Sequence, residues 1–244
     1  MSYSAFADYY DFLTENIDYN EIAEYYDRLN KKFGGIKGIM LDLACGTGSL
    51  SVILNGMGYD VIGVDISEEM LSVAVSKEHE GIEYLCQSMT ELDMFGTIDG
   101  TICSLDSINH LESIDEVSET FKKVSLFSNK GALFMFDINT LYKHENVLSD
   151  NTFVYDTEKV YCVWQNEYAG EGRTEIYLDF FSEDSETGLY ERYSDDFSET
   201  AYPLDVIEKM LLEAGFEVCA CYEYLTESEP DEKSEKVTFI ARKI

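Results

Sequence analysis

The sequence predicts an α/β fold in which helices cover both faces of a mostly parallel sheet. Short apolar runs alternate with segments of helical periodicity over the first 140 residues, and this alternation is typical of βαβ units. Several runs are apolar throughout, which indicates strands buried on both faces. With 244 residues, of which 45% are hydrophobic, the chain is long enough for one such domain and a modest insertion.

The first half is expected to begin with two helices, because apolar side chains recur at helical spacing over 6–13 and again over 22–33. Further apolar runs predict strands at 39–43, 61–65, 82–86, 101–105 and 132–138. Helices are expected between them at 49–57, 67–80 and 113–128. Ser67 and Ser113 are the residues expected to cap the last two of these helices.

From residue 153 the pattern changes to the alternation typical of antiparallel strands. Strands are expected at 160–164, 174–180 and 189–193, separated by turns that contain glycine. A helix that starts at Pro203 and closing strands at 216–225 and 236–242 return the chain to the first fold. We therefore expect a domain formed by 1–140 and 201–244, with a helical lid at 1–34, and an inserted antiparallel subdomain at 141–200.

The charge balance restricts the partners of the chain. Forty-nine acidic residues against 17 basic ones give a formal net charge of -32, which repels nucleic-acid phosphates and anionic membrane surfaces. We expect neither as a partner. The chain starts without a signal-peptide pattern and has no apolar run of membrane-spanning length, which predicts a cytoplasmic protein. A monomer and a homodimer are both compatible with the sequence.

No metal chemistry is expected from the cysteines. The six of them are scattered without a CxxC pair, and only three histidines accompany them, so neither a zinc site nor a disulfide framework is predicted. Cys219 and Cys221 share a face of an expected strand, where two small apolar side chains in a core account for them.

A glycine turn after the first expected strand is the main candidate for a ligand site. Gly46 and Gly48 have no Cβ, so the backbone there can lie against an adenosyl group. Thr47 opens the helix that follows. Asp65 ends the second expected strand, where this topology places a carboxylate that accepts hydrogen bonds from both ribose hydroxyls.

The glycines alone leave two cofactor classes open, because Gly46, Gly48 and Ser51 nearly match a dinucleotide-binding fingerprint. Asp42 distinguishes the two classes. An acid at the end of the first strand would face a pyrophosphate unfavourably, but it suits the cationic amino end of S-adenosylmethionine (SAM), directly or through water. SAM is therefore the expected cofactor, and a nicotinamide-dependent oxidoreductase is the less favoured alternative.

Two segments resemble motifs of the class I SAM-dependent methyltransferases. Segment 41–48, Leu-Asp-Leu-Ala-Cys-Gly-Thr-Gly, is similar to their first motif, and segment 64–67 together with Met70 is similar to their second. The resemblance extends over nearly the whole chain and is closest to a bacterial group of small-molecule type with an inserted antiparallel sheet. It implies a Rossmann-like fold with a seven-stranded sheet, and transfer of a methyl group from SAM to a small-molecule acceptor, which leaves S-adenosylhomocysteine (SAH).

The resemblance also implies which residues hold the cofactor. They lie near the N-terminus and at the ends of the first four strands: Tyr10, Asp42, Ala44, Cys45, Gly46, Thr47, Gly48, Asp65, Ile66, Met70, Ser88, Met89, Leu105 and Asp106. Ser88 and Met89 would border the adenine, whereas Leu105 and Asp106 would border the methionine portion. Related sequences usually carry an acid where Ser88 stands, and a serine hydroxyl would accept from the adenine amino group more weakly, unless the backbone takes over.

The chemistry expected of such a site is alignment of a nucleophile with the methyl group on the sulfonium. Where the acceptor carries a proton, a base adds rate, and Asp106 and His110 are the candidates for this catalytic role. Their structural alternatives are local hydrogen bonding by Asp106 and an ordinary loop position for His110. Asn109 and Trp164 are candidates for contact with the acceptor. The aromatic side chains of the insert are expected either to roof the acceptor pocket or to form a dimer contact.

The functional class expected from these residues is a SAM-dependent methyltransferase, with a nitrogen, oxygen or carbon nucleophile left open. A non-catalytic SAM-binding or sensor protein would retain the same motifs, so no residue pattern excludes it. A protein or tRNA acceptor is less favoured, and the net negative charge counts against tRNA.

Overall fold

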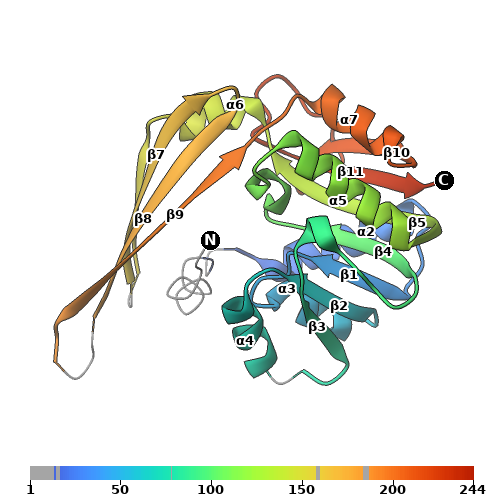
Figure 1. Cartoon of the computed structure of the whole chain (residues 1–244), viewed down its shortest axis with the longest axis horizontal. Helices are drawn as coiled ribbons and strands as arrows, with labels where there is room; N and C mark the ends of the chain where they lie inside the picture. Colours follow the sequence, from blue (N-terminus) through green and yellow to red (C-terminus); the bar gives the residue numbers. More distant parts are fainter. Residues whose placement is uncertain (1–13, 15–16, 78, 158–159, 184–186) are drawn as a thin grey trace.

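The structure, a computed structural model, describes residue 14 and residues 17–77, 79–157, 160–183 and 187–244. These residues form two β-sheets. The larger sheet has the strand order β10-β11-β5-β4-β1-β2-β3 (Figure 1). Its strands are β1 (Ile39–Leu43), β2 (Asp60–Asp65), β3 (Ile82–Cys86), β4 (Ile98–Cys103), β5 (Ser128–Asn139), β10 (Phe216–Glu223) and β11 (Lys236–Lys243). β1 to β5 run parallel and β11 runs antiparallel to its neighbours. The predicted mostly parallel sheet is confirmed.

Helices cover both faces of this sheet, as predicted. They are α2 (Tyr19–Lys32), α3 (Ser49–Gly56), α4 (Glu68–Ser76), α5 (Ile114–Phe127) and α7 (Leu204–Glu213). The short α6 (Leu141–Lys143) leads into the insert, and there are helical turns at η1 (Met89–Glu91), η2 (Ser107–His110) and η3 (His144–Leu148). Phe121 of α5 and Leu211 of α7 share one core with Leu41 of β1. The neighbouring β1 residue Met40 faces the opposite core, which contains Leu54 of α3. Among the helices described, none is long and apolar enough to cross a membrane.

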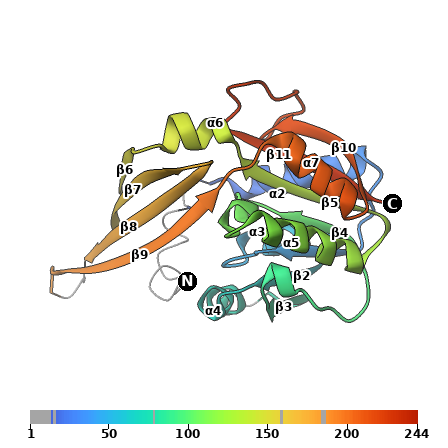
Figure 2. The same ribbon diagram turned by 45° about the horizontal axis from the view of Figure 1, so that its top comes forward.

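The insert forms the second sheet, which is antiparallel and extends away from the larger one (Figures 1 and 2). Its strands are β6 (Thr152–Asp156), β7 (Val160–Gly170), β8 (Arg173–Glu183) and β9 (Tyr190–Thr200), paired in that order. Three of them correspond to the predicted strands but are longer, and β6 was not predicted as a strand. One face of the sheet is buried around Cys162, Ile176, Leu178 and Phe180.

Helix α2, the described helix of the expected lid at 1–34, lies in the core, whereas Thr14 and Ile17 before it line the cavity described below. Helix α2 packs against the sheet, where Tyr25, Tyr26 and Leu29 are fully buried, because its apolar residues recur every three or four positions on one face. It therefore belongs to the core of the domain. The first expected helix, at 6–13, lies outside the described residues, and so does the candidate cofactor residue Tyr10.

Strand β4 ends earlier than predicted, and this changes the site. The strand expected at 101–105 occupies Ile98–Cys103, because Leu105 and Asp106 adopt left-handed backbone conformations, with φ of 56° and 53°. Their two N–H groups donate to the carboxylate of Asp137, Leu105 N to Oδ2 at 2.9 Å and Asp106 N to Oδ1 at 2.8 Å. This bond pair holds both residues in a turn at the end of the sheet.

Candidate active site

One cavity of about 550 Å³ lies at the carboxyl ends of the parallel strands, where ligands bind in open α/β sheets. On the side of the sheet it is lined by Ala44, Gly46, Asp65, Ile66, Met70, Ser88, Met89, Leu105, Asp106 and His110. On the side of the insert it is lined by Tyr155, Trp164, Leu178, Phe197 and Glu199. The insert therefore supplies one wall of the cavity.

Asp65 ties the glycine turn to the end of β2. Its Oδ2 accepts from Gly46 N at 2.8 Å and its Oδ1 accepts from Ser67 N at 2.9 Å. Burial raises the pKa of Asp65, although these backbone hydrogen bonds act against the shift. Since a carboxylate oxygen can accept two hydrogen bonds, each oxygen retains acceptor capacity toward the cavity.

The two glycines of the turn have different reasons to be glycine. Gly46 has a φ of 54°, and a Cβ built there meets nothing within 4 Å, so the space beside it opens into the cavity. Gly48 lines neither cavity of the described chain. A Cβ on it would lie 2.5 Å from Tyr84 Oη, so its small size serves packing. The expectation that Gly48 gives the cofactor access stays a prediction.

Asp42 faces a small second cavity of about 30 Å³ that also touches Cys45 and Thr47. This cavity shares Ala44, Gly46 and Leu105 with the large one, so the two adjoin. The side chain is 1% exposed, and its Oδ2 accepts from Ser51 Oγ at 2.5 Å. Burial raises the pKa of Asp42 to about 6. A cationic group placed in this cavity would favour its ionised form.

These residues fit an adenosyl cofactor with a cationic end. The open space at Gly46 admits a group against the backbone, and Asp65 offers acceptor capacity to hydroxyl groups beside it. Ile66, Met70 and Met89 add apolar surface to the same part of the cavity. Ser88 lines it too, although its Oγ already accepts from Thr90 N at 3.3 Å.

Asp106 is a fixed anion in an ion pair with Lys236. Lys236 Nζ lies 2.8 Å from Asp106 Oδ1 and 3.4 Å from Asp137 Oδ1, and Asn139 Nδ2 donates to the other oxygen of Asp106. Burial acts to raise the pKa of Asp106, but the charges of Lys236 and Lys143 outweigh it and hold the pKa well below its usual value. A carboxylate of this kind accepts a proton poorly, which counts against Asp106 as the expected base.

Asn109 does not line the cavity, in contrast to its expected contact with the acceptor. Its Nδ2 donates to the carbonyl oxygens of Asn139, at 3.2 Å, and Thr200, at 3.0 Å. Its Oδ1 accepts from Asn139 N at 2.9 Å. The side chain is 2% exposed. Asn109 thus joins η2 to β5 and to the last strand of the insert, and its polar atoms are used in the fold.

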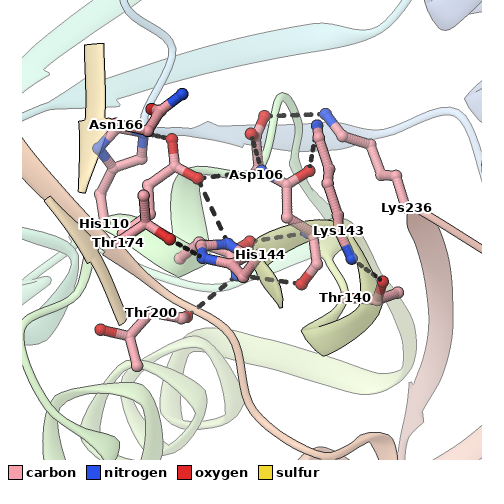
Figure 3. Close-up of polar contacts among 12 residues, drawn as sticks. Asp106, His110, Thr140, Lys143, His144, Asn166, Thr174, Thr200 and Lys236 are labelled. Atoms are coloured by element: carbon pink, nitrogen blue, oxygen red, sulfur yellow. Dashed lines mark hydrogen bonds and ion pairs between the residues drawn. The ribbon is translucent and has the colours of Figure 1, made fainter. Parts of the chain in front are cut away.

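His110 faces a carboxylate that comes from the insert. Its Nε2 lies 3.8 Å from Glu199 Oε1, and its ring packs on Phe197 with centroids 5.0 Å apart. Glu199 Oε2 lies 3.7 Å from His144 Nε2 and accepts from Asn139 Nδ2 at 3.0 Å. Figure 3 shows the two histidines on the side of the cluster away from Lys236. This places His110, a predicted catalytic candidate, beside a buried acid.

Sequence reasoning missed Glu199 and Lys236. The strand containing Glu199 was predicted to end at residue 193, so the alternation that puts Phe197 and Glu199 on one face was not followed. Glu199 lies on the same face of this strand as the aromatic Phe197, and this pattern could have indicated a ligand-facing acid. Lys236 begins a correctly predicted strand, but nothing in the local sequence indicates its partner 130 residues away.

The stability of the protein is expected to fall in mild acid because of His144. Burial, aided by the charge of Lys143, lowers the pKa of His144 to about 4, whereas an unfolded histidine titrates near 6.5. Between these values the unfolded chain binds more protons, so acidification favours unfolding. We expect His144→Asn to remove about 2 kcal/mol of the loss between pH 7 and pH 5, measured by urea unfolding. Replacement of the exposed His79 by Asn is the matched control, and an equal loss in both variants would contradict this assignment.

The fold and the cavity define a class: an α/β protein with a ligand-sized cavity at the carboxyl ends of its parallel strands. The chain belongs to the SAM-dependent methyltransferases. A family model described as a methyltransferase domain matches residues 40–127. A relative from Geobacillus sp. (strain WCH70), named as a methyltransferase, is 34% identical, with the whole of both chains covered.

Solved structures agree with this assignment. A SAM-dependent methyltransferase from Clostridium acetobutylicum has a TM-score of 0.89 and 30% identity, with 99% of this chain and 98% of that chain covered. SAM-bound CalS10, an amino pentose methyltransferase from Micromonospora echinaspora, has a TM-score of 0.76 over 96% of this chain and 94% of that chain. At 17% identity, CalS10 supports the fold alone.

Proposed function

We propose that this methyltransferase acts on a small-molecule acceptor, which binds between the SAM turn and the insert. The observation that carries the proposal is the single cavity that touches both Gly46 and Glu199. Its volume of about 550 Å³ lies within the usual range for small-molecule pockets, about 300–1,000 Å³. The net charge of -32 disfavours a nucleic-acid acceptor.

The residues at the sheet end of the cavity are proposed to hold the cofactor. When bound, SAM supplies an activated methyl group on a sulfonium. Asp65 would accept from the ribose hydroxyls, with Ile66, Met70 and Met89 against the adenosyl group. Asp42 would face the cationic amino end through the small cavity. Binding at both ends would fix SAM for transfer of its methyl group to the acceptor. Such alignment contributes up to about 7–11 kcal/mol in favourable cases.

The residues at the insert end are proposed to hold the acceptor. Trp164, Phe197 and Leu178 form an apolar wall, and Trp164 is fixed there because its Nε1 donates to Asn166 Oδ1 at 2.7 Å. This arrangement supports the expected role of Trp164. His110, which lines the cavity next to Glu199 of this wall, is the group that we propose as the proton acceptor.

The proposal is tested by binding and by turnover. Calorimetry should detect SAM and SAH binding, with no binding of NAD(H). Transfer of a labelled methyl group to components of a metabolite panel should then give products of low molecular mass. Label that appears only in protein or RNA of a lysate would refute the small-molecule acceptor, and tight SAM binding without transfer to any acceptor would favour the sensor alternative.

SAM affinity is expected to rise with pH because of Asp42. Its pKa of about 6 in the free protein means that most Asp42 is neutral at pH 5 and ionised at pH 7. A cationic amino group prefers the ionised form, so binding should strengthen about tenfold over this interval, as measured by calorimetry. Asp42→Asn should flatten the dependence, whereas Asp60→Asn, at an exposed position on β2, should preserve it. A slope unchanged by Asp42→Asn would rule the assignment out.

A further inference from the structure

We propose that the acceptor is a protonated amine and that Glu199 is the carboxylate that binds its ammonium group. This inference rests on the proposed function and names the acceptor class of the same cavity. It is carried by the position of Glu199, whose side chain lines the cavity although only 4% of it is exposed. A carboxylate that is both buried and in contact with a ligand cavity is suited to bind a cation there.

The hydrogen bonds of Glu199 leave much of its acceptor capacity unused. Among the described residues, the donor recorded within hydrogen-bond distance is Asn139 Nδ2, 3.0 Å from Oε2. The two histidine Nε2 atoms lie at 3.8 Å from Oε1 and 3.7 Å from Oε2, beyond that distance. A carboxylate accepts about four hydrogen bonds when fully satisfied. An ammonium group has three N–H donors and a positive charge, so it would supply the hydrogen bonds and the countercharge that Glu199 lacks.

The neighbouring cations do not neutralise Glu199. Lys236 is paired with Asp106 at 2.8 Å and lies 3.4 Å from Asp137. Lys143 Nζ donates to the amide oxygen of Asn139 at 2.8 Å. His144 is held neutral because burial lowers its pKa to about 4. Burial also raises the pKa of Glu199, and the charge of Asp106 adds to the effect, which outweighs the opposing influence of His110, Asn139 and Lys143.

The rest of the cavity favours a cation with an apolar body. Its lining contains five carboxylates, Asp65, Asp106, Glu112, Glu116 and Glu199, against one lysine, the paired Lys236. Such a lining attracts cations from solvent. The aromatic rings of Tyr155, Trp164 and Phe197 lie in the same wall as Glu199. Aromatic faces accommodate ammonium groups as well as apolar surface.

The proton balance of the reaction uses His110. The ammonium group gives one proton to His110 Nε2, which lies 3.8 Å from Glu199 Oε1. The nitrogen lone pair then forms a bond to the methyl carbon while the carbon–sulfur bond breaks and leaves its electron pair on sulfur. The product is a methylammonium ion and SAH, and the proton on His110 returns to solvent.

Benzylamine and benzyl alcohol are a matched pair of probes for this inference. Their binding to the SAH-loaded full chain is measured by NMR titration. We expect the amine to bind at least about tenfold more tightly, from the charged hydrogen bonds it makes to Glu199. Glu199→Gln should abolish this preference and leave the affinity for the alcohol within about twofold of wild type. Glu191→Gln, an exposed position on the same strand, should keep the preference.

The outcomes separate this inference from the proposed function. Equal binding of the two probes, or a preference for the amine that survives Glu199→Gln, would overturn the amine assignment even if labelled SAM methylates a neutral small molecule. Absence of SAH binding would overturn the proposed function, and the inference with it. Circular dichroism and SAH affinity establish whether the Glu199→Gln protein is folded, and the preference of the wild type tests the acceptor class without any variant.

Discussion

Asp65→Ala is expected to weaken SAM binding by roughly 10–100-fold, from loss of charged hydrogen bonds to the ribose hydroxyls. The side chain lines the cavity, and its two oxygens accept from Gly46 N and Ser67 N. Removal of the carboxylate therefore takes away the proposed ligand contact and also the link between β2 and the glycine turn. Calorimetric titration with SAM and with SAH measures the effect.

The control for this change is Asp60→Ala, which removes an exposed carboxylate at the opposite end of the same strand. It should bind SAM as the wild type does. Asp65→Asn separates the two contributions, because the amide oxygen still accepts one backbone hydrogen bond while the negative charge is lost. Wild-type affinity in Asp65→Ala would remove Asp65 from the cofactor site and with it the main support for the proposed binding mode.

The grouping of the candidate cofactor residues could be predicted because its information is local. Asp42 and Gly46 belong to one strand and turn, and Asp65 ends the next strand in the sheet. The carboxyl ends of neighbouring parallel strands meet at one edge, so the order of elements alone brings these residues together. The hydrogen bond from Gly46 to Asp65 is the physical result.

The acceptor end could not be predicted in the same way, because its contacts join distant segments. Glu199 meets Asn139 across 60 residues, Asn109 meets Thr200 across 91, and Lys236 meets Asp106 across 130. These contacts depend on how the insert and the last strand pack against the first part of the domain, and the periodicity of the sequence does not predict that packing. Asn109 was therefore assigned to the acceptor although its polar atoms are engaged in the fold, and the ion pair of Asp106 with Lys236 was not foreseen.

The end of β4 is another feature that could not be predicted from the local sequence. Leu105 continues an apolar run, so the sequence favours a strand through that position. The strand stops at Cys103 because Asp137, on the neighbouring strand β5, accepts the N–H groups of Leu105 and Asp106 in left-handed conformations. A tertiary hydrogen bond thus outweighs local propensity where the chain enters the cavity.

Asp137→Ala is expected to lower the free energy of unfolding by about 3–5 kcal/mol, the usual cost of removing one partner from a buried charge network. The carboxylate is fully buried and accepts from Tyr26 Oη at 2.9 Å as well as from the two backbone N–H groups of the β4 turn. Three donors, one buried and two partly buried, lose their acceptor in the variant, and Lys236 loses one of its two acidic neighbours. Urea unfolding at neutral pH measures the difference.

The network also predicts how the loss spreads to the cavity. Left-handed backbone costs about 1–2 kcal/mol per non-glycine residue, so without Asp137 the turn at Leu105 and Asp106 should relax and displace two lining residues. SAM affinity should therefore fall together with stability in Asp137→Ala, and less so in Asp137→Asn, which retains one acceptor oxygen. Asp60→Ala should change neither. A loss below about 1 kcal/mol would be close to the effect of an ordinary surface substitution. Asp137 would then matter no more to stability than the exposed carboxylate of Asp60, and it would not be the residue that holds the turn.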